Sequence, residues 1–334
     1  MLKPIVVVGS INLDLVVGAD RIPQVGETII GSSFNVFCGG KGANQAVAAA
    51  KLGHPVSMVG NVGNDAFGAQ LRRGLEHAGV DTTYVNTVEG ASGVALITTG
   101  LGGENNIVVV PGANGQLTPR LLEKAAAILE HAGFLLAQLE IPLETVEYLA
   151  EFAEQHGIPL MLDPAPAREL SDKLFQKVSW ITPNETETEV LLKIKLENGD
   201  RGCYAAAESL LGHGVKNVLL KLGPRGCLIA QGRLPKERLA SFSVDAVDTT
   251  AAGDAFNAGF AVGLMRGFTV ARSAVFASAV AAISVTRHGA QPSMPTLAEV
   301  KAFVNERLGP GASLFSAETD IEDNLDSVLP GNGT

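Results

Sequence analysis

The sequence predicts an α/β protein with a doubly wound, mostly parallel central sheet, helices on both faces and a small antiparallel β lid. Short apolar runs bounded by glycine and polar residues recur along the chain, with helical patterns between them. The runs are apolar throughout and do not alternate, which is typical of strands buried on both faces. The chain has 334 residues, 46% of them apolar, and 38 glycines, which suits a large, loop-rich α/β domain.

Five apolar runs are the expected core strands. They read "IVVVGS" (5–10), "FLLAQLE" (134–140), "PLMLDPA" (159–165), "WITPN" (180–184) and "NVLLKLG" (217–223). Each ends in a polar residue or glycine: Gly9 and Ser10, Glu140, Asp163, Asn184 and Gly223. Because the carboxyl ends of parallel strands meet at one edge of a sheet, these residues are expected to form one site.

Two stretches do not follow the strand–helix alternation. Residues 11–37 and about 92–110 alternate as strands do around glycine-rich turns, which predicts a small antiparallel sheet outside the core. Such a sheet could act as a lid over a ligand. Its unpaired edges would be protected if two copies of the chain paired, so a homodimer through the lid is expected.

The charge balance excludes several partner classes. Lys and Arg number 25 and Asp and Glu 35, a net charge of −10 that repels nucleic acid and anionic membranes. The acidic segment from residue 309 to residue 334 is expected to be a flexible tail. No run is long enough to cross a bilayer.

The sequence has an odd number of cysteines, and they are widely spaced: Cys38, Cys203 and Cys227. This pattern fits a reducing compartment, so a cytoplasmic protein with three buried thiols is expected.

Several catalytic motifs are absent from the sequence. It has no G-x-x-x-x-G-K-[ST] loop, no G-x-S-x-G elbow and no C-x-x-C pair. The first strand is followed by "GSINLD" where a dinucleotide-binding protein would carry G-x-G-x-x-G, which makes a dehydrogenase the weakest alternative.

Two glycine- and alanine-rich segments are the best candidates for a site. "CGGKGANQAVAAAKLG" (38–53) places Lys41 and Asn44 at a helix start, where they can donate to hydroxyl groups, although a plain glycine turn capping a helix would look the same. "DTTAAGDAFNAGF" (248–260) leaves bare backbone before Asp254 at the start of a second helix, and the amides there suit an anion that forms in a transition state.

These two segments resemble the signature motifs of the ribokinase family of sugar kinases, also called the phosphofructokinase B group. The resemblance runs from about residue 4 to residue 308 and includes "GSINLD", "TPNETE" and "SVTRHGAQPS" in the family's order. It implies a kinase domain over residues 1–308, and it is greatest to members that use ATP and magnesium to phosphorylate the 5-hydroxyl of D-ribose.

The resemblance also implies roles for individual residues. Asp254 would be the catalytic base, beside an anion hole of backbone amides from Ala251, Ala252 and Gly253. The sugar would be bound by Asn12, Asp14, Gly40, Lys41, Asn44 and Glu140. ATP and its Mg²⁺ would be held by Asn184, Glu187, Lys221, Gly223, Gly226 and Ser278. An activating K⁺ would be bound by Asp248 and Thr250, with backbone oxygens near Ser284, Gly289 and Ser293.

Physical chemistry adds expectations and alternatives to these roles. An aspartate at a helix N-terminus should keep a low pKa, which a loose phosphoryl-transfer transition state tolerates. Asn12 would favour ribose over 2-deoxyribose, because a deoxy sugar leaves its amide unpaired, although a turn residue is the alternative. Asp248 could simply cap its helix. Lys221 could reach a phosphate or lie at the surface.

Other functions remain open at the level of sequence. Kinases of fructose, deoxyribose, adenosine or ketodeoxy sugars would share the Asp254 motif, and a sugar sensor could have kept the fold without catalysis. The intact Asp254, Gly253 and Asn184 argue against a sensor, since a sensor needs no base. "GSINLD" with "GGKGANQ" favours ribose among the kinases.

Overall fold

The computed structural model describes residues 2–102, 104–197 and 199–308. The predicted acidic tail, residues 309–334, lies outside the described residues. The strands within these ranges are β1 (Ile5–Val8), β2 (Asn12–Gly18), β3 (Ser33–Gly39), β4 (Val56–Gly63), β5 (Asp81–Val88), β6 (Gly93–Thr99), β7 (Asn105–Val110), β8 (Phe134–Gln138), β9 (Leu160–Asp163), β10 (Trp180–Ile181), β11 (Asn217–Lys221), β12 (Cys227–Gln231) and β13 (Glu237–Leu239).

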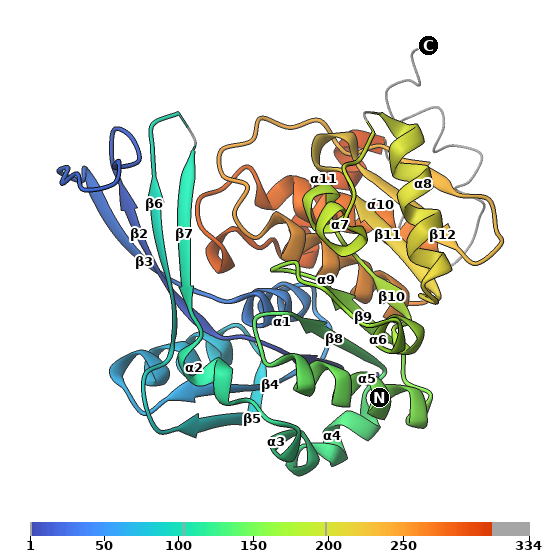
Figure 1. The fold of residues 1–334 in the computed structure, drawn as a ribbon, viewed down its shortest axis with the longest axis horizontal. Helices are drawn as coiled ribbons and strands as arrows, with labels where there is room; N and C mark the ends of the chain where they lie inside the picture. Colours follow the sequence, from blue (N-terminus) through green and yellow to red (C-terminus); the bar gives the residue numbers. More distant parts are fainter. Residues whose placement is uncertain (1, 103, 198, 309–334) are drawn as a thin grey trace.

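The helices alternate with the strands of the core (Figure 1). In the described residues they are α1 (Lys41–Lys51), α2 (Ala66–His77), α3 (Pro119–Lys124), α4 (Ala126–His131), α5 (Leu143–His156), α6 (Asp172–Lys177), α7 (Glu185–Leu192), α8 (Asp200–Gly212), α9 (Ala252–Met265), α10 (Val270–Ser284) and α11 (Leu297–Leu308), with short 3₁₀ turns η1 (Gly112–Gln116), η2 (Gly223–Arg225) and η3 (Gln291–Ser293).

The large sheet is mostly parallel, as predicted. Its order over the described residues is β13-β12-β11-β10-β9-β8-β1-β4-β5, and only β12 and β13 run antiparallel to their neighbours. All five predicted core strands are present. From β1 the chain first builds outward through β4 and β5 and then returns to add β8 on the other side of β1. The β1–β8 boundary is therefore the topological switch point, where ligands of such sheets bind.

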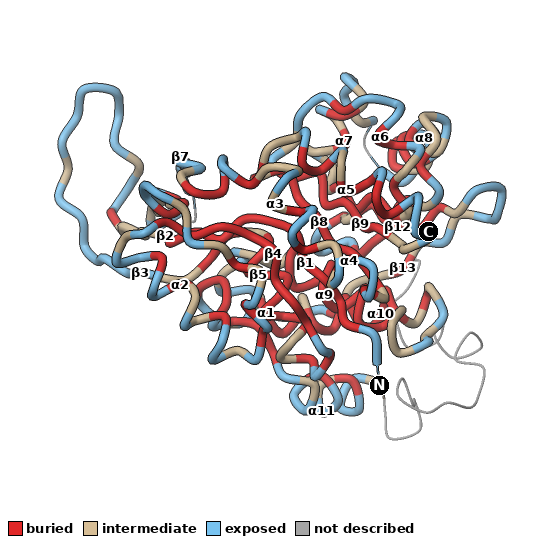
Figure 2. Tube along the Cα trace, turned by 90° about the horizontal axis from the view of Figure 1, so that it is seen from below, coloured by how far each residue is buried: buried red, intermediate tan, exposed pale blue. Residues whose placement is uncertain are grey.

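Each face of the sheet has its own helix layer. Ile5 and Val7 of β1 pack in one apolar cluster with α1, α2, α9, α10 and α11, whereas Val6 and Val8 pack in a second cluster with α3 to α8. Because successive strand residues point to opposite faces, a uniformly apolar strand serves both layers. Figure 2 shows the buried segments concentrated in this layered body, while the long loop beyond β2 and β3 is exposed.

The two stretches predicted as a lid form a separate sheet in the order β3-β2-β6-β7. It projects from one side of the α/β body (Figure 1). The outer pairs, β2 with β3 and β6 with β7, are antiparallel as expected, but the central β2–β6 pair is parallel. Each hairpin leaves the body through its first strand, so the two first strands run side by side in the same direction.

Two smaller predictions are also tested by the structure. Cys203 and Cys227 are buried, but Cys38 at the end of β3 is only partly buried, so the prediction of three buried thiols is wrong for Cys38. That residue borders a cavity between β3 and α2, which leaves its side chain partly open. None of the helices in the described ranges is long and apolar enough to span a membrane.

Candidate functional site

The ends of β1 and β8 meet the start of α1 at the switch point. Ser10 Oγ donates to Glu140 Oε2 at 2.5 Å, and the amide of Lys41 donates to the same oxygen at 3.2 Å. Gly42 N donates in turn to Ser10 Oγ at 3.3 Å. The Glu140 carboxylate is therefore fixed against the N-terminus of α1, where the helix dipole favours a negative charge.

Glycine is required where α1 meets β1. Gly40, the N-cap of α1, has a φ of 88°, and a Cβ there would lie 2.6 Å from the amide nitrogen of Asn12. At Gly42 a Cβ would lie 2.7 Å from the carbonyl carbon of Gly9. The motif "GGKG" thus brings the start of α1 into direct contact with the end of β1.

Asn12 and Asp14 reach the same region from the base of the lid, on β2. Asn12 Oδ1 accepts a hydrogen bond from Asn114 Nδ2 at 2.6 Å, and Asn114 Oδ1 accepts from the Ile11 amide at 2.9 Å. Asn12 Nδ2 therefore faces away from Asn114, and it approaches Glu140 Oε2 at 3.5 Å. Asn114, on η1, was missed at the level of sequence, where it looks like one more turn residue.

Asp14 is surrounded by charged side chains of the same site. Its burial and the nearby carboxylates of Glu140 and Asp254 raise the pKa of Asp14 to about 7, while Lys41 acts in the opposite direction. The structure thus gathers the charged side chains predicted to bind sugar from β2, α1 and the end of β8. A carboxylate with so high a pKa gains from hydroxyl groups that donate to it, because each such bond stabilises the charged form.

Asp254 lies in the first turn of α9 and is 5% exposed. Asn44 Nδ2 donates to its Oδ2 at 3.1 Å and Gln45 Nε2 to its Oδ1 at 3.0 Å. Burial raises the pKa of Asp254 to about 6, with Asp163 adding to the rise and Lys41 and the two amides opposing it. The low pKa expected from the helix N-terminus is therefore wrong, because desolvation outweighs the helix dipole.

The backbone before Asp254 presents amide groups. Ala251, the N-cap of α9, has a φ of 58°, and no side chain caps the helix. The Ala252 amide donates to Thr249 O at 3.2 Å, whereas no described residue accepts a hydrogen bond from the amides of Gly253 and Asp254. Free amides at a helix N-terminus form an anion site. Of the predicted anion-hole residues, Gly253 has a free amide and Ala252 does not, and the Asp254 amide was not predicted.

A cavity of about 1030 Å³ opens beside these amides. Among its lining residues are Ala252, Gly253 and four of the residues predicted to bind ATP: Lys221, Gly223, Gly226 and Ser278. Apolar side chains such as Phe242 and Phe256 line it as well, which suits a flat heteroaromatic ring with a charged tail. Asp254 thus stands near the predicted sugar-binding side chains on one side and near this cavity on the other.

Asn184 and Glu187 form a capping box at the start of α7. Asn184 Oδ1 accepts from the Glu187 amide and Glu187 Oε2 from the Asn184 amide, both at 2.7 Å. Neither residue lines the cavity, but Asn184 pairs with Lys221 through the backbone. Burial raises the pKa of Glu187, and the Lys221 ammonium counteracts this.

Lys221 does not lie at the surface. Its Nζ is 2.9 Å from Asp163 Oδ1, and the two side chains are 12% and 4% exposed. A Cβ on Gly253 would be 3.3 Å from Lys221 Nζ, so the ammonium lies next to the free amides. Asp163 stood out in the sequence as a polar strand end, but no role was assigned to it.

The loop around Asp248 is joined to the turn at Gly289. Asp248 Oδ1 accepts from the Thr250 amide at 2.9 Å and Oδ2 from the Gly289 amide at 2.8 Å. Since Ala251 is the N-cap of α9, Asp248 does not cap that helix. The hydroxyls of Ser284 and Ser293 donate to backbone carbonyls three residues earlier. The structure thus links the predicted cation residues Asp248, Thr250 and Gly289 directly.

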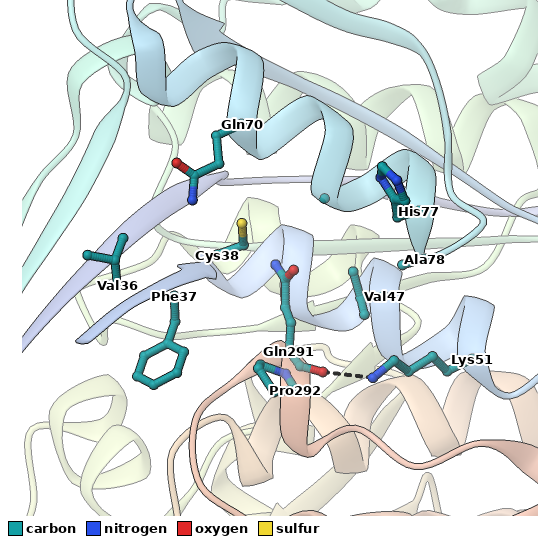
Figure 3. A pocket seen from close by; sticks show the side chains of 11 residues that line it. Val36, Phe37, Cys38, Val47, Lys51, Gln70, His77, Ala78, Gln291 and Pro292 are labelled. Atoms are coloured by element: carbon teal, nitrogen blue, oxygen red, sulfur yellow. Dashed lines mark hydrogen bonds between the residues drawn. The ribbon is translucent and has the colours of Figure 1, made fainter.

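A second, smaller cavity of about 390 Å³ lies at the foot of the lid (Figure 3). It is bordered by Cys38 on β3, Lys51 on α1, His77 on α2 and Gln291 on η3. Lys51 Nζ donates to Gln291 O at 2.9 Å across its floor. None of the predicted site residues lines it.

Comparison with known proteins shows which family this chain belongs to. The family model for pfkB family carbohydrate kinases matches residues 2–297. This chain belongs to the pfkB family. It is 40% identical to a ribokinase of Haemophilus influenzae, over 91% of this chain and 99% of the relative, and 40% identical to a deoxyribokinase of Salmonella typhi, over 90% and 98%. The solved structure of Arabidopsis thaliana ribokinase complexed with ribose and ATP superposes with a TM-score of 0.85 at 34% identity, covering 91% and 99% of the chains. The α/β class and the kinase family expected from the sequence are both confirmed.

Proposed function

We propose that this pfkB-family kinase transfers the γ-phosphoryl group of ATP to the 5-hydroxyl of D-ribose and forms ribose 5-phosphate. The observation that carries the proposal is the position of Asp254. Its carboxylate is buried beside free helix amides, with the side chains predicted to bind sugar near it and the 1030 Å³ cavity beside those amides. A carboxylate and an anion site next to one another are what a hydroxyl and a migrating phosphoryl group require.

Asp254 is the proposed base. As the sugar oxygen bonds to the γ-phosphorus and the bond to the β,γ-bridging oxygen breaks, the hydroxyl proton passes to Asp254 and ADP departs. A pKa of about 6 leaves most of this carboxyl ionised at neutral pH and makes it a better base than a helix N-terminal aspartate of low pKa. The Gly253 amide, with those of Ala251 and Ala252 nearby, is the proposed anion hole.

Ribose is proposed to lie between the lid base and α1. Asp14 accepts hydrogen bonds from two sugar hydroxyls, and Asn12 Nδ2 donates to a hydroxyl. Lys41 and Asn44 donate to hydroxyls or orient the sugar. Glu140 and Gly40 lie beside these groups at the N-terminus of α1. Asn12 supports ribose in particular, because Asn114 holds its amide in one orientation and a deoxy sugar would leave the buried Nδ2 without that partner.

The nucleotide is proposed to occupy the cavity lined by Lys221, Gly223, Gly226 and Ser278. No group of three His, Cys, Asp or Glu side chains in the described ranges could hold a metal ion. Mg²⁺ is proposed to arrive on the ATP phosphates and to keep its waters, with Asn184 and Glu187 binding those waters. When bound, Mg²⁺ would neutralise phosphate charge.

A monovalent cation such as K⁺ is proposed at the Asp248 loop. The donor set fits a hard ion, since Asp248 and Thr250 offer oxygens and the backbone near Ser284, Gly289 and Ser293 offers carbonyls. The hydrogen bond that Asp248 accepts from Gly289 already joins the two loops, and the one from Thr250 fixes its own loop; the ion would stiffen both further.

Deoxyribose is the second candidate substrate, because a deoxyribokinase matches this chain as well as a ribokinase does. Kinases of other sugars or nucleosides are weaker candidates, and a non-catalytic sensor would not need Asp254. We also propose a cytoplasmic homodimer paired through the lid. In support, the lid exposes apolar side chains, among them Phe34, Leu96, Ile107 and Val108.

The test of the function is an ADP-release assay with ribose, 2-deoxyribose, fructose and adenosine, each with and without K⁺. Ribose should give the highest kcat/KM, and K⁺ should raise kcat. A higher kcat/KM for 2-deoxyribose or a nucleoside would overturn the substrate assignment but leave the reaction type intact. Sedimentation of the full chain tests the dimer, and Ile107→Lys with Leu96→Lys should yield monomers.

A further inference from the structure

One buried amide joins two carboxylates in this site. Gln45 Nε2 donates to Asp254 Oδ1 at 3.0 Å and to Asp163 Oδ2 at 3.1 Å. Asp254 opens α9 and Asp163 ends β9, so the two carboxylates come from different elements. An amide NH₂ group has two protons, and here each is given to a different carboxylate.

The orientation of that amide is fixed from its other side. Gln138 Nε2 donates to Gln45 Oε1 at 2.8 Å, so the oxygen of the Gln45 amide faces Gln138 and its nitrogen faces the carboxylates. Gln45 and Gln138 are 1% and 0% exposed, so these hydrogen bonds are buried away from the surface. A half-turn of the amide would set oxygen against two carboxylates and would lose all three hydrogen bonds.

The same amide also reaches the nucleotide side of the centre. The other oxygen of Asp163, Oδ1, accepts a hydrogen bond from Lys221 Nζ at 2.9 Å, and Lys221 lies next to Gly253. Gln45 therefore donates a hydrogen bond directly to the proposed base. Through Asp163 it is also linked to the Lys221 ammonium, which lies beside the proposed anion hole.

We propose that Gln45 is a positioning residue of the phosphoryl-transfer reaction: its amide sets the direction of the Asp254 carboxylate and, through Asp163, the place of the Lys221 ammonium. The proposal rests on the assignment of Asp254 as the base. Gln45 neither gives nor takes a proton in the reaction. It acts by offering one donor to each of two like charges that would otherwise repel each other.

The electrostatic surroundings of Asp254 predict the direction of the effect. Facing it are Lys41 from α1, Asp163 from β9 and, from the lid base, Asp14. The Gln45 bond favours the ionised form, so its loss raises the pKa of Asp254. A hydrogen bond to a charged acceptor corresponds to a shift of about one to two pH units.

The experiment measures single-turnover phosphoryl transfer at saturating ribose and ATP across the pH range, together with ribose binding by calorimetry. Gln45→Met keeps the length of the side chain and removes the amide. Its rate at pH 7 should fall about tenfold or more, and the acid limb of its pH–rate profile should move to higher pH by about one unit. Its ribose affinity should stay nearly unchanged. Gln45→Glu keeps an oxygen for Gln138 but adds a third carboxyl, so its acid limb should move further.

Controls separate this proposal from general damage and from the base assignment. Gln231→Met removes a half-buried glutamine amide in β12 that donates to Asn217, and it should keep the wild-type acid limb. If the acid limb of the pH–rate profile does not move in Gln45→Met while Asp254→Asn is inactive, the proposal for Gln45 is overturned and the base assignment stands. If Asp254→Asn is active, the base assignment itself is overturned. If Gln45→Met does not fold, Gln138→Met frees the amide to rotate. A smaller upward shift of its limb supports the proposal, and no shift refutes it.

Discussion

Replacing Lys221 with methionine tests whether its pair with Asp163 is a working part of the centre. Methionine keeps most of the length of the side chain and removes the ammonium. The carboxylate left behind is 4% exposed and has lost a partner at 2.9 Å. Within the described residues, its remaining side-chain donor is the neutral Gln45 amide, at 3.1 Å.

The expected loss of stability follows from the burial of the Asp163 carboxylate. Removing one partner of a buried ion pair lowers the free energy of unfolding by about 3–5 kcal/mol, and the remaining Gln45 bond places Lys221→Met near the lower end, about 3 kcal/mol. The double variant Lys221→Met/Asp163→Asn removes both charges of this pair and should recover at least about 2 kcal/mol of this. Lys221→Met should also raise KM for ATP, because an ammonium near the phosphates is lost.

Urea unfolding followed by the fluorescence of Trp180 measures these stabilities. Trp180 is the single tryptophan and packs edge-on against Phe260 in the core at 4.8 Å between ring centroids. The matched control is Lys195→Met, which breaks an exposed pair with Glu189 and should change stability by less than about 1 kcal/mol. Equal losses in Lys221→Met and Lys195→Met, or a double variant no more stable than Lys221→Met, would refute the reasoning.

Three further predictions concern the acids and the sugar. Asp14, with a pKa of about 7, and Asp254, with a pKa of about 6, must both be ionised in the free enzyme. A plot of log kcat/KM for ribose against pH should therefore fall with a slope approaching two below about pH 6. Asp14→Asn should reduce that slope to one, and a slope of one in the wild type would contradict the assignment. Asn12→Leu should reduce the preference for ribose over 2-deoxyribose by about 10- to 100-fold, measured as the ratio of kcat/KM values, and an unchanged ratio would exclude Asn12 from sugar selection. Asp248→Asn should lower kcat in K⁺ by about tenfold with little change in KM for ribose, measured over a K⁺ titration, and undiminished activation would place the ion elsewhere.

The sequence predicted the strands that are apolar throughout and the polar residues that follow them. It missed β4, whose "VSMVGNVG" contains Gly60, Asn61 and Gly63, residues typical of turns. The structure explains one of them, since a Cβ on Gly60 would lie 2.9 Å from Gly9 O on the neighbouring strand. Such close approach depends on strand order, which no local pattern reveals.

The site was predicted where a motif carries the chemistry and missed where tertiary burial creates it. Asp254 could be singled out from its neighbours, but its raised pKa comes from burial beside Asp163, which is 91 residues away in the chain. Gln45 and Asn114 were missed because a single amide side chain acquires a role only when its partners are known. Gln45 follows Asn44 in the helix-start motif, and that position was the one signal that could have drawn attention to it.

The most direct test of the proposed chemistry is the single-turnover rate of Asp254→Asn with ribose and ATP, measured on protein whose binding of both substrates has been checked by calorimetry. Asparagine keeps the shape and the contact with Asn44 but cannot accept the hydroxyl proton. The rate should fall by about 10³-fold while the ribose dissociation constant stays within about threefold of the wild-type value. A rate within about tenfold of wild type, with both substrates bound, would contradict the role of this carboxylate as the base.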